Sequence, residues 1–267
     1  MVARRKKAST STRKPAFDPK GKILCIFGES PLVEEYAVHC VARSFTVHAR
    51  INSTEKDAVR LLPKGAKAVR KGSPDSSLAL ELTNTSAESK RKNLMELDKT
   101  LPLQTLILTS SITITVAEQT TWVQHPDRIV GIAALPSLLD GEMIEFALPP
   151  HPENSATMRA MEFASWLGKE AAFVQDSIGM VLPRIICMLA NEACFAIAEG
   201  VATSADIDTA MKYGTNYPSG PVEWTDKIGS RQVFAVMRAL ADSFGEDRYR
   251  VAPLLQRSAL LNVVPGR

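Results

Sequence analysis

The sequence predicts an α/β fold in which a mostly parallel sheet is followed by an all-α part. Strand-like apolar runs alternate with helical patterns over the first half of the chain, which is typical of parallel strands covered by helices on both faces. From residue 176 onward the pattern is helical throughout. At 267 residues, 45% of them apolar, the chain is long enough for two ordinary domains.

The expected sheet begins with the apolar run from Ile23 to Phe27, which ends at Gly28. A second strand is expected at residues 44–52, because every second residue from Phe45 to Ile51 is apolar. Further strands are expected at residues 66–73, 76–83, 103–111 and 128–136, and the helices between them at residues 33–42, 86–100 and 116–123.

The next segments change from alternating to helical patterns. A helix from Ser155 is expected to stop at Gly168, and a short strand then closes the sheet. Residues 178–200 are apolar almost all round, as expected of a helix buried in a bundle or at a subunit interface. Helices are also expected at residues 204–212, 221–228 and 231–244.

Composition excludes several classes of protein. No apolar run approaches the roughly 18–20 residues that a membrane span needs, and the N-terminus lacks the apolar stretch of a secretory signal, so a cytoplasmic protein is expected. The cysteines form no CxxC pair and lie in apolar runs, which favours reduced, buried thiols over a metal site or disulfides. These are Cys25, Cys40, Cys187 and Cys194.

The first residues differ in charge from the rest of the chain. Residues 1–22 carry eight Lys or Arg and one acid, Asp18, although the whole chain has a net charge of only +3. Such a basic, Ser/Thr-rich segment predicts a disordered tail over residues 1–20. No basic patch with interleaved aromatic residues follows, so a nucleic-acid partner is not favoured.

Residues 176–229 carry the most specific motifs. They include Asn191 to Ala193 on the long helix, "ADIDTAMKYG" at residues 205–214 and "YPSGPVEWTDKIG" at residues 217–229. This segment closely resembles the C-terminal domain of the 3-hydroxyacyl-CoA dehydrogenases. Residues 78–98 and 106–115 look like later strands of the same family's first domain. The chain lacks the helical hairpin that many members insert after the second strand.

The resemblance implies a Rossmann-like, NAD-binding-type domain at residues 21–175 and a helical C-terminal dimerisation domain at residues 176–267. It implies NAD on the sheet and acyl-CoA in the cleft between the domains. It also implies a homodimer, or a heteromer with a related dehydrogenase. Four solvated histidines are expected, the last two at the border of the cleft: His39, His48, His125 and His151.

The catalytic groups of the family are only partly present. Its catalytic His falls on Ala133, which has no proton to give or take. The Glu that orients this His falls on Glu145, and the Ser that polarises the substrate carbonyl falls on Ser110. The active-site Asn falls on Pro183, which donates no hydrogen bond. Ser110 and Glu145 are therefore the candidate catalytic residues, and no metal is expected.

The cofactor loop departs from the dinucleotide fingerprint. Its three glycine positions hold Gly28, Ser30 and Val33, and Pro31 removes an N–H group from the helix start that would bind the phosphates. The acid expected at the end of the second strand falls within Arg50, Ile51 and Asn52, none of which is a carboxylate. Arg50 could meet a 2′-phosphate. Gly28, Ser30, Arg50 and Lys90 are the candidate cofactor residues, but the pattern does not favour NAD binding.

Two functions remain from the sequence. The first is a 3-hydroxyacyl-CoA dehydrogenase-like protein of acyl-CoA metabolism with impaired or lost hydride transfer, kept as a dimeric structural or regulatory partner. The second is an active, atypical NAD(P)-dependent 3-hydroxyacyl-CoA dehydrogenase with relocated catalytic groups. Ser110 and Glu145 support the second function, and the losses in the cofactor loop and at Ala133 and Pro183 support the first.

Overall fold

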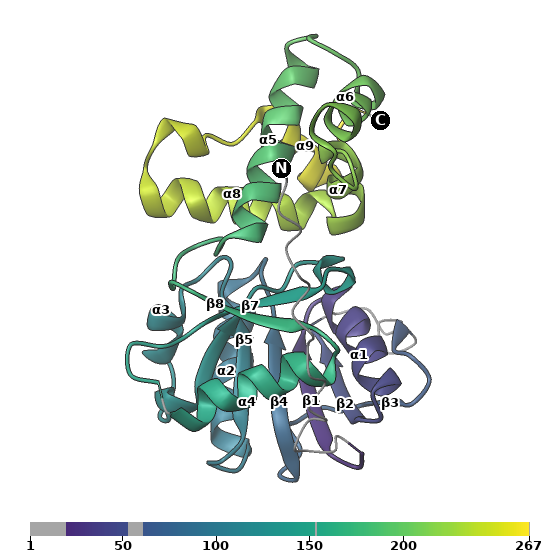
Figure 1. Ribbon diagram of the computed structural model, residues 1–267. Coiled ribbons are helices and arrows are strands. Elements are labelled where there is room, and N and C mark those ends of the chain that lie inside the picture. The colour runs from purple at the N-terminus through teal and green to yellow at the C-terminus, as the bar shows by residue number, and fades with distance from the viewer. Residues whose placement is uncertain (1–19, 53–60, 153, 267) are drawn as a thin grey trace, which may run out of the picture.

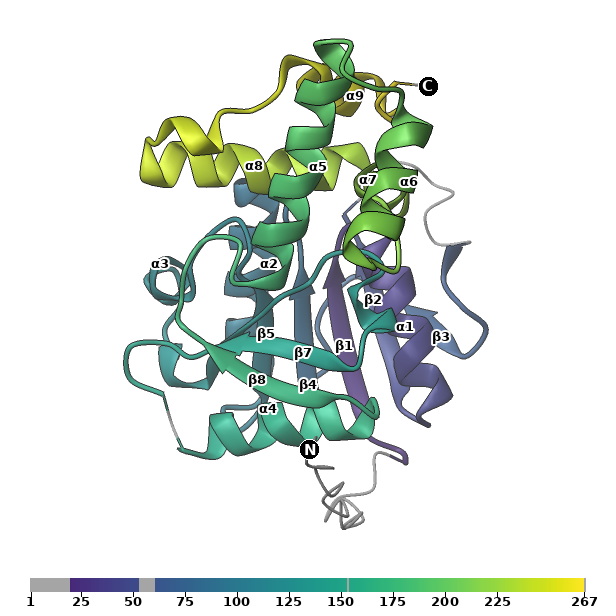
Figure 2. The same ribbon diagram turned by 45° about the horizontal axis from the view of Figure 1, so that its top comes forward.

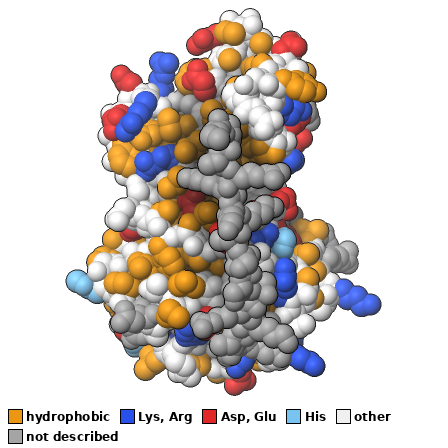
Figure 3. All heavy atoms as spheres, viewed as in Figure 1, with side chains coloured by type: hydrophobic (Ala, Val, Ile, Leu, Met, Phe, Trp, Pro, Cys, Tyr) orange, Lys and Arg blue, Asp and Glu red, His pale blue; other side chains and the backbone are white. Residues whose placement is uncertain are grey.

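The structure is a computed structural model that describes residues 20–52, 61–152 and 154–266. Apart from Lys20, the predicted basic tail lies outside these residues. The chain forms a lower part built on a sheet and an upper part built from helices (Figure 1). On the face seen in Figure 3, hydrophobic side chains reach the surface of both parts. Within the described residues, no helix has the length and apolar character needed to cross a membrane.

The sheet has the strand order β3-β2-β1-β4-β5-β6-β7-β8 in the described residues. All neighbouring strands run parallel except β6 and β7, which are antiparallel. The mostly parallel α/β class predicted from the sequence is therefore confirmed. The strands are β1 (Ile23–Gly28), β2 (Thr46–Ile51), β3 (Ala66–Ala68), β4 (Ser76–Leu82), β5 (Leu106–Ser110), β6 (Ile129–Ile132), β7 (Met143–Ala147) and β8 (Glu170–Val174).

Three strands differ clearly from their prediction. The strand expected at residues 128–136 is β6, which ends at Ile132. The strand expected at residues 66–73 ends at Ala68, because turn-forming residues, among them Gly72 and Pro74, follow it. Strand β7 has no predicted counterpart, because Glu145 interrupts its short apolar run. A carboxylate in the middle of a short strand obscures the apolar pattern on which strand prediction depends.

Four helices cover the two faces of the sheet. Side chains of α1 (Leu32–Ala42) and α4 (Asn154–Trp166) pack in one apolar cluster on one face. Side chains of α2 (Ala87–Thr100) and α3 (Val116–Thr120) pack in a second cluster on the opposite face. The short 3₁₀ segments Pro126–Arg128 and Leu138–Asp140 flank β6.

The upper part consists of helices in the described residues. They are α5 (Leu182–Ala198), α6 (Ser204–Thr215), α7 (Pro221–Ile228), α8 (Ser230–Phe244) and α9 (Pro253–Leu261), with a 3₁₀ turn at Asp247–Tyr249. The arrows of β1 and β4 point toward these helices (Figure 2). The carboxyl ends of the parallel strands therefore face the helical part, which is where α/β sheets usually place a ligand.

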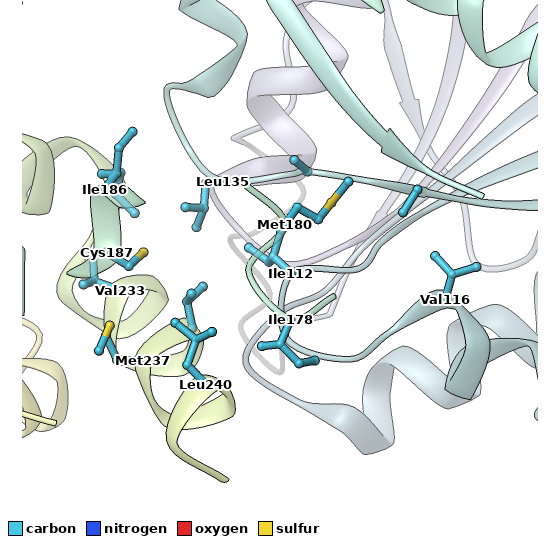
Figure 4. Packing of buried hydrophobic residues seen from close by; sticks show 14 of the residues in the cluster. Ile112, Val116, Leu135, Ile178, Met180, Ile186, Cys187, Val233, Met237 and Leu240 are labelled. Atoms are coloured by element: carbon cyan, nitrogen blue, oxygen red, sulfur yellow. The ribbon is translucent and has the colours of Figure 1, made fainter. Parts of the chain in front are cut away.

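One apolar cluster joins the two parts. It contains Ile186 and Cys187 of α5, Val233 and Met237 of α8, and Leu135 from the loop after β6. Figure 4 shows these side chains close to Ile112, Ile178 and Met180 of the sheet part. Burial of such surface is the main favourable term in packing. It therefore stabilises the contact between the helices and the carboxyl edge of the sheet.

The motifs that carry the family resemblance have structural roles in the helical part. The amide of Asn191 donates to the carbonyl of Arg250 at 2.9 Å and accepts the N–H of Ala252 at 2.8 Å. The carboxylate of Asp208 accepts the N–H groups of Val222 and Glu223 at the start of α7. These bonds satisfy backbone groups that a helix end leaves unpaired.

Candidate functional site

The candidate site lies at the carboxyl edge of the sheet, between β1 and β4. The strand order reverses direction here, and such switch points form the ligand crevice of α/β sheets. Glu29 directly follows β1, and its carboxylate is buried, with 9% of the residue exposed. It accepts the N–H of Asn84 at 2.9 Å and the N–H and hydroxyl of Thr85 at 3.2 and 2.5 Å. It also accepts the amide of Gln232, from α8, at 2.6 Å.

Asn84 connects this carboxylate to the neighbouring strands. Its amide donates to the carbonyl of Ala134 and to the side-chain oxygen of Gln232, both at 2.9 Å. Its side-chain oxygen accepts the hydroxyl of Ser110 at 2.5 Å. The candidate catalytic Ser110 is thus fully buried, and its hydroxyl is held by Asn84. Its catalytic role stays a prediction.

Lys90 lies inside the protein rather than at a ligand surface. Only 1% of this residue is exposed, and its ammonium donates to Glu81 at 2.5 Å and to the carbonyl of Ser110 at 2.7 Å. Glu81 also accepts the amide of Asn93. A role of Lys90 in cofactor binding stays a prediction, and its burial counts against it.

Gly28 permits a close approach of two strands. A Cβ at this position would lie 2.6 Å from the carbonyl oxygen of Leu82 on β4. Real side chains do not tolerate such a contact with backbone, so any larger residue would push β1 and β4 apart. The lack of space for a side chain at Gly28 therefore comes from the packing of the two neighbouring strands.

Ser30 and Arg50, the other two cofactor candidates, already have partners within the chain. The hydroxyl of Ser30 donates to Glu34 at 2.6 Å on the surface. The guanidinium of Arg50 donates to Glu96 and to Asn93, each at 2.8 Å, and lies 3.8 Å from the centre of the Phe27 ring. An incoming phosphate would have to compete with these contacts.

Ala133 and Glu145 lie side by side across β6 and β7. The N–H of Ala133 donates to the carbonyl of Glu145 at 3.0 Å. Both residues line a residual cavity of about 10 Å³, together with Tyr36, Leu139 and Leu182. A cavity needs roughly 10–15 Å³ to hold a single water molecule, so the space beside Ala133 in this structure is close to the size of one water.

The carboxylate of Glu145 caps the N-terminal end of α5. It accepts the N–H of Val181 at 2.9 Å and that of Leu182 at 2.8 Å, at the first turn of α5. A negative group at this end of a helix also complements the helix dipole. Pro183 is the second residue of α5 and is buried. Proline is favourable at such a position, because the N–H that it lacks would have no partner in the helix.

Glu35 is a second carboxylate at the same edge of the sheet. It lies on α1 and accepts the N–H of Ser137, in the loop after β6, at 2.9 Å. Burial raises the pKa of Glu35 above its ordinary value, and the hydrogen bond from Ser137 opposes this effect. Glu35 thus joins α1 to the loop that follows Ala133.

An open cavity of about 720 Å³ lies next to the Glu29 cluster. Asn84, Thr85 and Thr115 line one side of it, and α8 lines another. From α8 come Arg231, Phe234, Ala235, Arg238, Ala239 and Asp242. The volume is typical of a small-molecule site. None of the described lining residues is a histidine, so this cavity offers no imidazole base.

His125 does not border this cavity. It precedes β6, at the amino edge of the sheet, and its Nδ1 lies 3.1 Å from the carboxylate of Asp98. The expectation that His125 borders the cleft is therefore wrong, because the chain reverses between α3 and β6.

In the described residues, no three His, Cys, Asp or Glu side chains form a group that could hold a metal ion.

Three residues of the site were not identified from the sequence. Glu29 lies next to the glycine of the loop, but a surface residue was equally consistent with its position. Gln232 is 203 positions away from Glu29 along the chain, and no sequence spacing links them. Asn84 carried no motif that would have distinguished it from other loop residues.

Comparison with known proteins supports the resemblance that the motifs of residues 176–229 indicate. Residues 179–265 match the model of the 3-hydroxyacyl-CoA dehydrogenase C-terminal domain. The chain is 37% identical over 121 residues to 3-hydroxyadipyl-CoA dehydrogenase of Escherichia coli K12, covering 45% of this chain and 26% of that protein. It is 29% identical over 181 residues to 3-hydroxybutyryl-CoA dehydrogenase of Bradyrhizobium diazoefficiens, covering 68% and 62%. The chain thus spans less than two thirds of the length of these two relatives.

The solved structures agree on the fold. The (S)-3-hydroxybutyryl-CoA dehydrogenase of Ralstonia eutropha superposes with a TM-score of 0.73 at 22% identity, covering 91% of this chain and 94% of that one. FadB2 of M. tuberculosis superposes with a TM-score of 0.78 at 17% identity and the same coverage. Residues 179–265 therefore match the C-terminal domain of the 3-hydroxyacyl-CoA dehydrogenases, and the chain as a whole is similar to such enzymes in sequence and in fold.

Proposed function

We propose that this chain is a 3-hydroxyacyl-CoA dehydrogenase homologue that has lost hydride transfer and acts as a dimeric structural or regulatory partner that binds an acyl-CoA. The observation that carries this proposal is the use of Glu145 as the cap of α5 beside Ala133. A general base must reach the proton that it abstracts. Alanine supplies no base, and the cavity beside it has only about the size of one water molecule.

The residues around the switch point do not fit a dinucleotide. The N–H groups of Asn84 and Thr85 already bind the carboxylate of Glu29. The helix start that would receive the phosphates has Pro31 at its N-cap, and Glu34 and Glu35 in its first turn oppose a further negative charge there. No step of the proposed function therefore involves NAD.

The open cavity supports the acyl-CoA part of the proposal. Arg231 supplies positive charge for phosphate groups, whereas Arg238 is paired with Asp242 at 2.9 Å. Phe234, Ile114 and Leu260 supply apolar surface for an acyl chain.

Exposed apolar residues at the start of α5 support the dimer. Val181, Leu182 and Ile185 are 49%, 44% and 50% exposed, and together they form the first turns of one helix. Contiguous apolar surface of this kind often marks a protein interface. A second copy of the chain is the proposed partner, with a related dehydrogenase as the heteromeric alternative.

Calorimetric titration with acetoacetyl-CoA, NADH and NADPH tests the ligand part. We expect heat of binding from acetoacetyl-CoA alone, and no loss of absorbance at the nicotinamide band when all are mixed. Arg231→Ala should weaken acetoacetyl-CoA binding, whereas Arg248→Ala, an exposed arginine away from the cavity, should not. Oxidation of NADH or NADPH would overturn the loss of hydride transfer and favour the active, atypical dehydrogenase.

Sedimentation equilibrium tests the dimer. We expect a mass twice that of one chain, and a shift toward the single-chain mass for Ile185→Asp. Met158→Asp changes a similarly exposed apolar residue on α4 and is the matched control. A single-chain mass for the unaltered protein, with no related dehydrogenase captured from a defined mixture, would count against this part.

A further inference from the structure

The carboxylate of Glu29 is surrounded by neutral hydrogen-bond donors. These are two consecutive peptide N–H groups, the hydroxyl of Thr85 and the amide of Gln232, all within 3.3 Å of a carboxylate oxygen. Glu29 belongs to the loop after β1, whereas the donors belong to the loop after β4 and to α8. Elements other than the loop of Glu29 therefore fix the donors in space.

The donors are also held by contacts of their own. The side chain of Asn84 is fixed by Ala134, Gln232 and Ser110. The hydroxyl of Ser86, the next residue after Thr85, caps α2 by accepting the N–H of Ser89. Converging, preorganised N–H groups form concave anion sites in many proteins.

We infer that the peptide N–H groups of Asn84 and Thr85, together with the amide of Gln232, form an anion-binding site that Glu29 fills as a built-in ligand. The chemistry that this site accepts is a small oxyanion, either a carboxylate or inorganic phosphate. With Glu29 in place, the site is closed to ions in solution. Without this side chain, the same donors bind such an ion from outside.

This inference goes beyond the proposed function and does not depend on it. The donors lie at the switch point, where they join the sheet to α8, so their occupant also ties the two parts of the molecule together. A carboxylate supplied by the chain is always present there. The cluster therefore needs no cofactor to satisfy its buried N–H groups.

Glu29→Ala opens the site and tests the inference. Its thermal unfolding is measured with sodium acetate or sodium phosphate against sodium chloride at the same ionic strength. We expect Tm to be lowered by the substitution and to recover with acetate or phosphate, by about 3 to 6 °C at ten times the dissociation constant. If the variant does not fold in chloride, refolding in acetate or phosphate should recover it.

Three controls separate the site from general effects of salt. Glu29→Gln keeps the site filled with a side chain of the same size, so acetate should not raise its Tm beyond the effect on the unaltered protein. Glu88→Ala removes an exposed carboxylate from α2 and should not respond either. Gln232→Leu, added to Glu29→Ala, removes one donor and should abolish most of the recovery.

The recovery of Tm in acetate or phosphate is compared among the variants. Recovery of Glu29→Ala alone supports it. No recovery, or equal recovery of Glu29→Ala, Glu29→Gln and Glu88→Ala, would overturn it. So would a Glu29→Ala variant that stays unfolded in acetate and phosphate while Glu29→Gln folds. None of these results depends on whether acetoacetyl-CoA binds in the open cavity.

Discussion

The N–H of Leu182 donates a 2.8 Å hydrogen bond to Glu145, which ties the first turn of α5 to β7. The two residues belong to the helical part and to the sheet part of the molecule. The family resemblance assigned Glu145 to the orientation of a histidine, but its carboxylate faces backbone N–H groups instead. The carboxylate of Glu145 thus has a structural role at the start of α5.

Glu145→Ala should destabilise the protein by about 1–3 kcal/mol, because two partly buried N–H groups lose a charged acceptor. The urea midpoint of unfolding measures the change. Glu142→Ala, three residues earlier and exposed, should alter the free energy of unfolding by less than about 0.5 kcal/mol. Equal midpoints for the two variants would contradict the capping role.

Lys90→Met should cost about 3–5 kcal/mol, because it leaves the buried carboxylate of Glu81 without its cation. Lys92→Met is the matched control, since Lys92 lies two residues further on α2 and pairs with Glu88 on the surface. Such exposed pairs contribute about 1 kcal/mol or less. Similar losses for both lysines in chemical unfolding would show that the buried pair has no special weight.

Gly28→Ala should lower the free energy of unfolding by about 1–3 kcal/mol, because the added methyl would meet the carbonyl of Leu82. Gly214→Ala should have the opposite sign. Gly214 lies in α6 with open space around it, and alanine is favoured over glycine in a helix by about 1 kcal/mol. Calorimetric unfolding of the two variants gives both signs in one experiment, and a stabilised Gly28→Ala would disprove the close-packing argument.

Asp98 should make the free energy of unfolding depend on pH in the acid range. Burial raises its pKa, but hydrogen bonds from Arg128, the Gln124 N–H and His125 outweigh this and lower the pKa below its ordinary value. The folded state therefore holds the proton less tightly than the unfolded state, whose Asp pKa is about 3.9. The stabilisation is present above that pH and is lost as the pH falls through the folded pKa.

Asp98→Asn should thus be less stable than the unaltered protein at neutral pH and should lose less stability below about pH 4. Urea midpoints measured across the acid range give the slope. Asp127→Asn changes an exposed acid near the same turn and should keep the original slope. An unchanged slope in Asp98→Asn would place the acid sensitivity on another group.

Some features of the fold follow directly from the pattern of residues. The run from Ile23 to Gly28 became β1, and the alternation from Phe45 to Ile51 became β2. Strand β7 did not follow, because Glu145 interrupts it. The bounds of α9 were not predicted, although a helical pattern was expected there, and its residues Leu260 and Leu261 are exposed.

The chemistry of the site was less predictable than the fold. Lys90 belongs to a helix rich in charged residues, and its sequence neighbours Arg91 and Lys92 are exposed. Only the packing of α2 on β4 shows that Lys90 points inward to Glu81. Likewise, Asp98 and His125 meet because α2 ends beside the turn before β6.

The sequence by itself determined the α/β class, the helical second part and the resemblance to the 3-hydroxyacyl-CoA dehydrogenases, because these depend on local periodicity and on contiguous motifs. The resemblance also predicts that Ala133 and Pro183 stand at positions where the family has polar groups. Only the tertiary structure decided which donors meet the carboxylates of Glu29 and Glu145. Hydrogen bonds depend on distances of about 3 Å between groups that the chain brings together from distant segments, and residue spacing does not encode those distances.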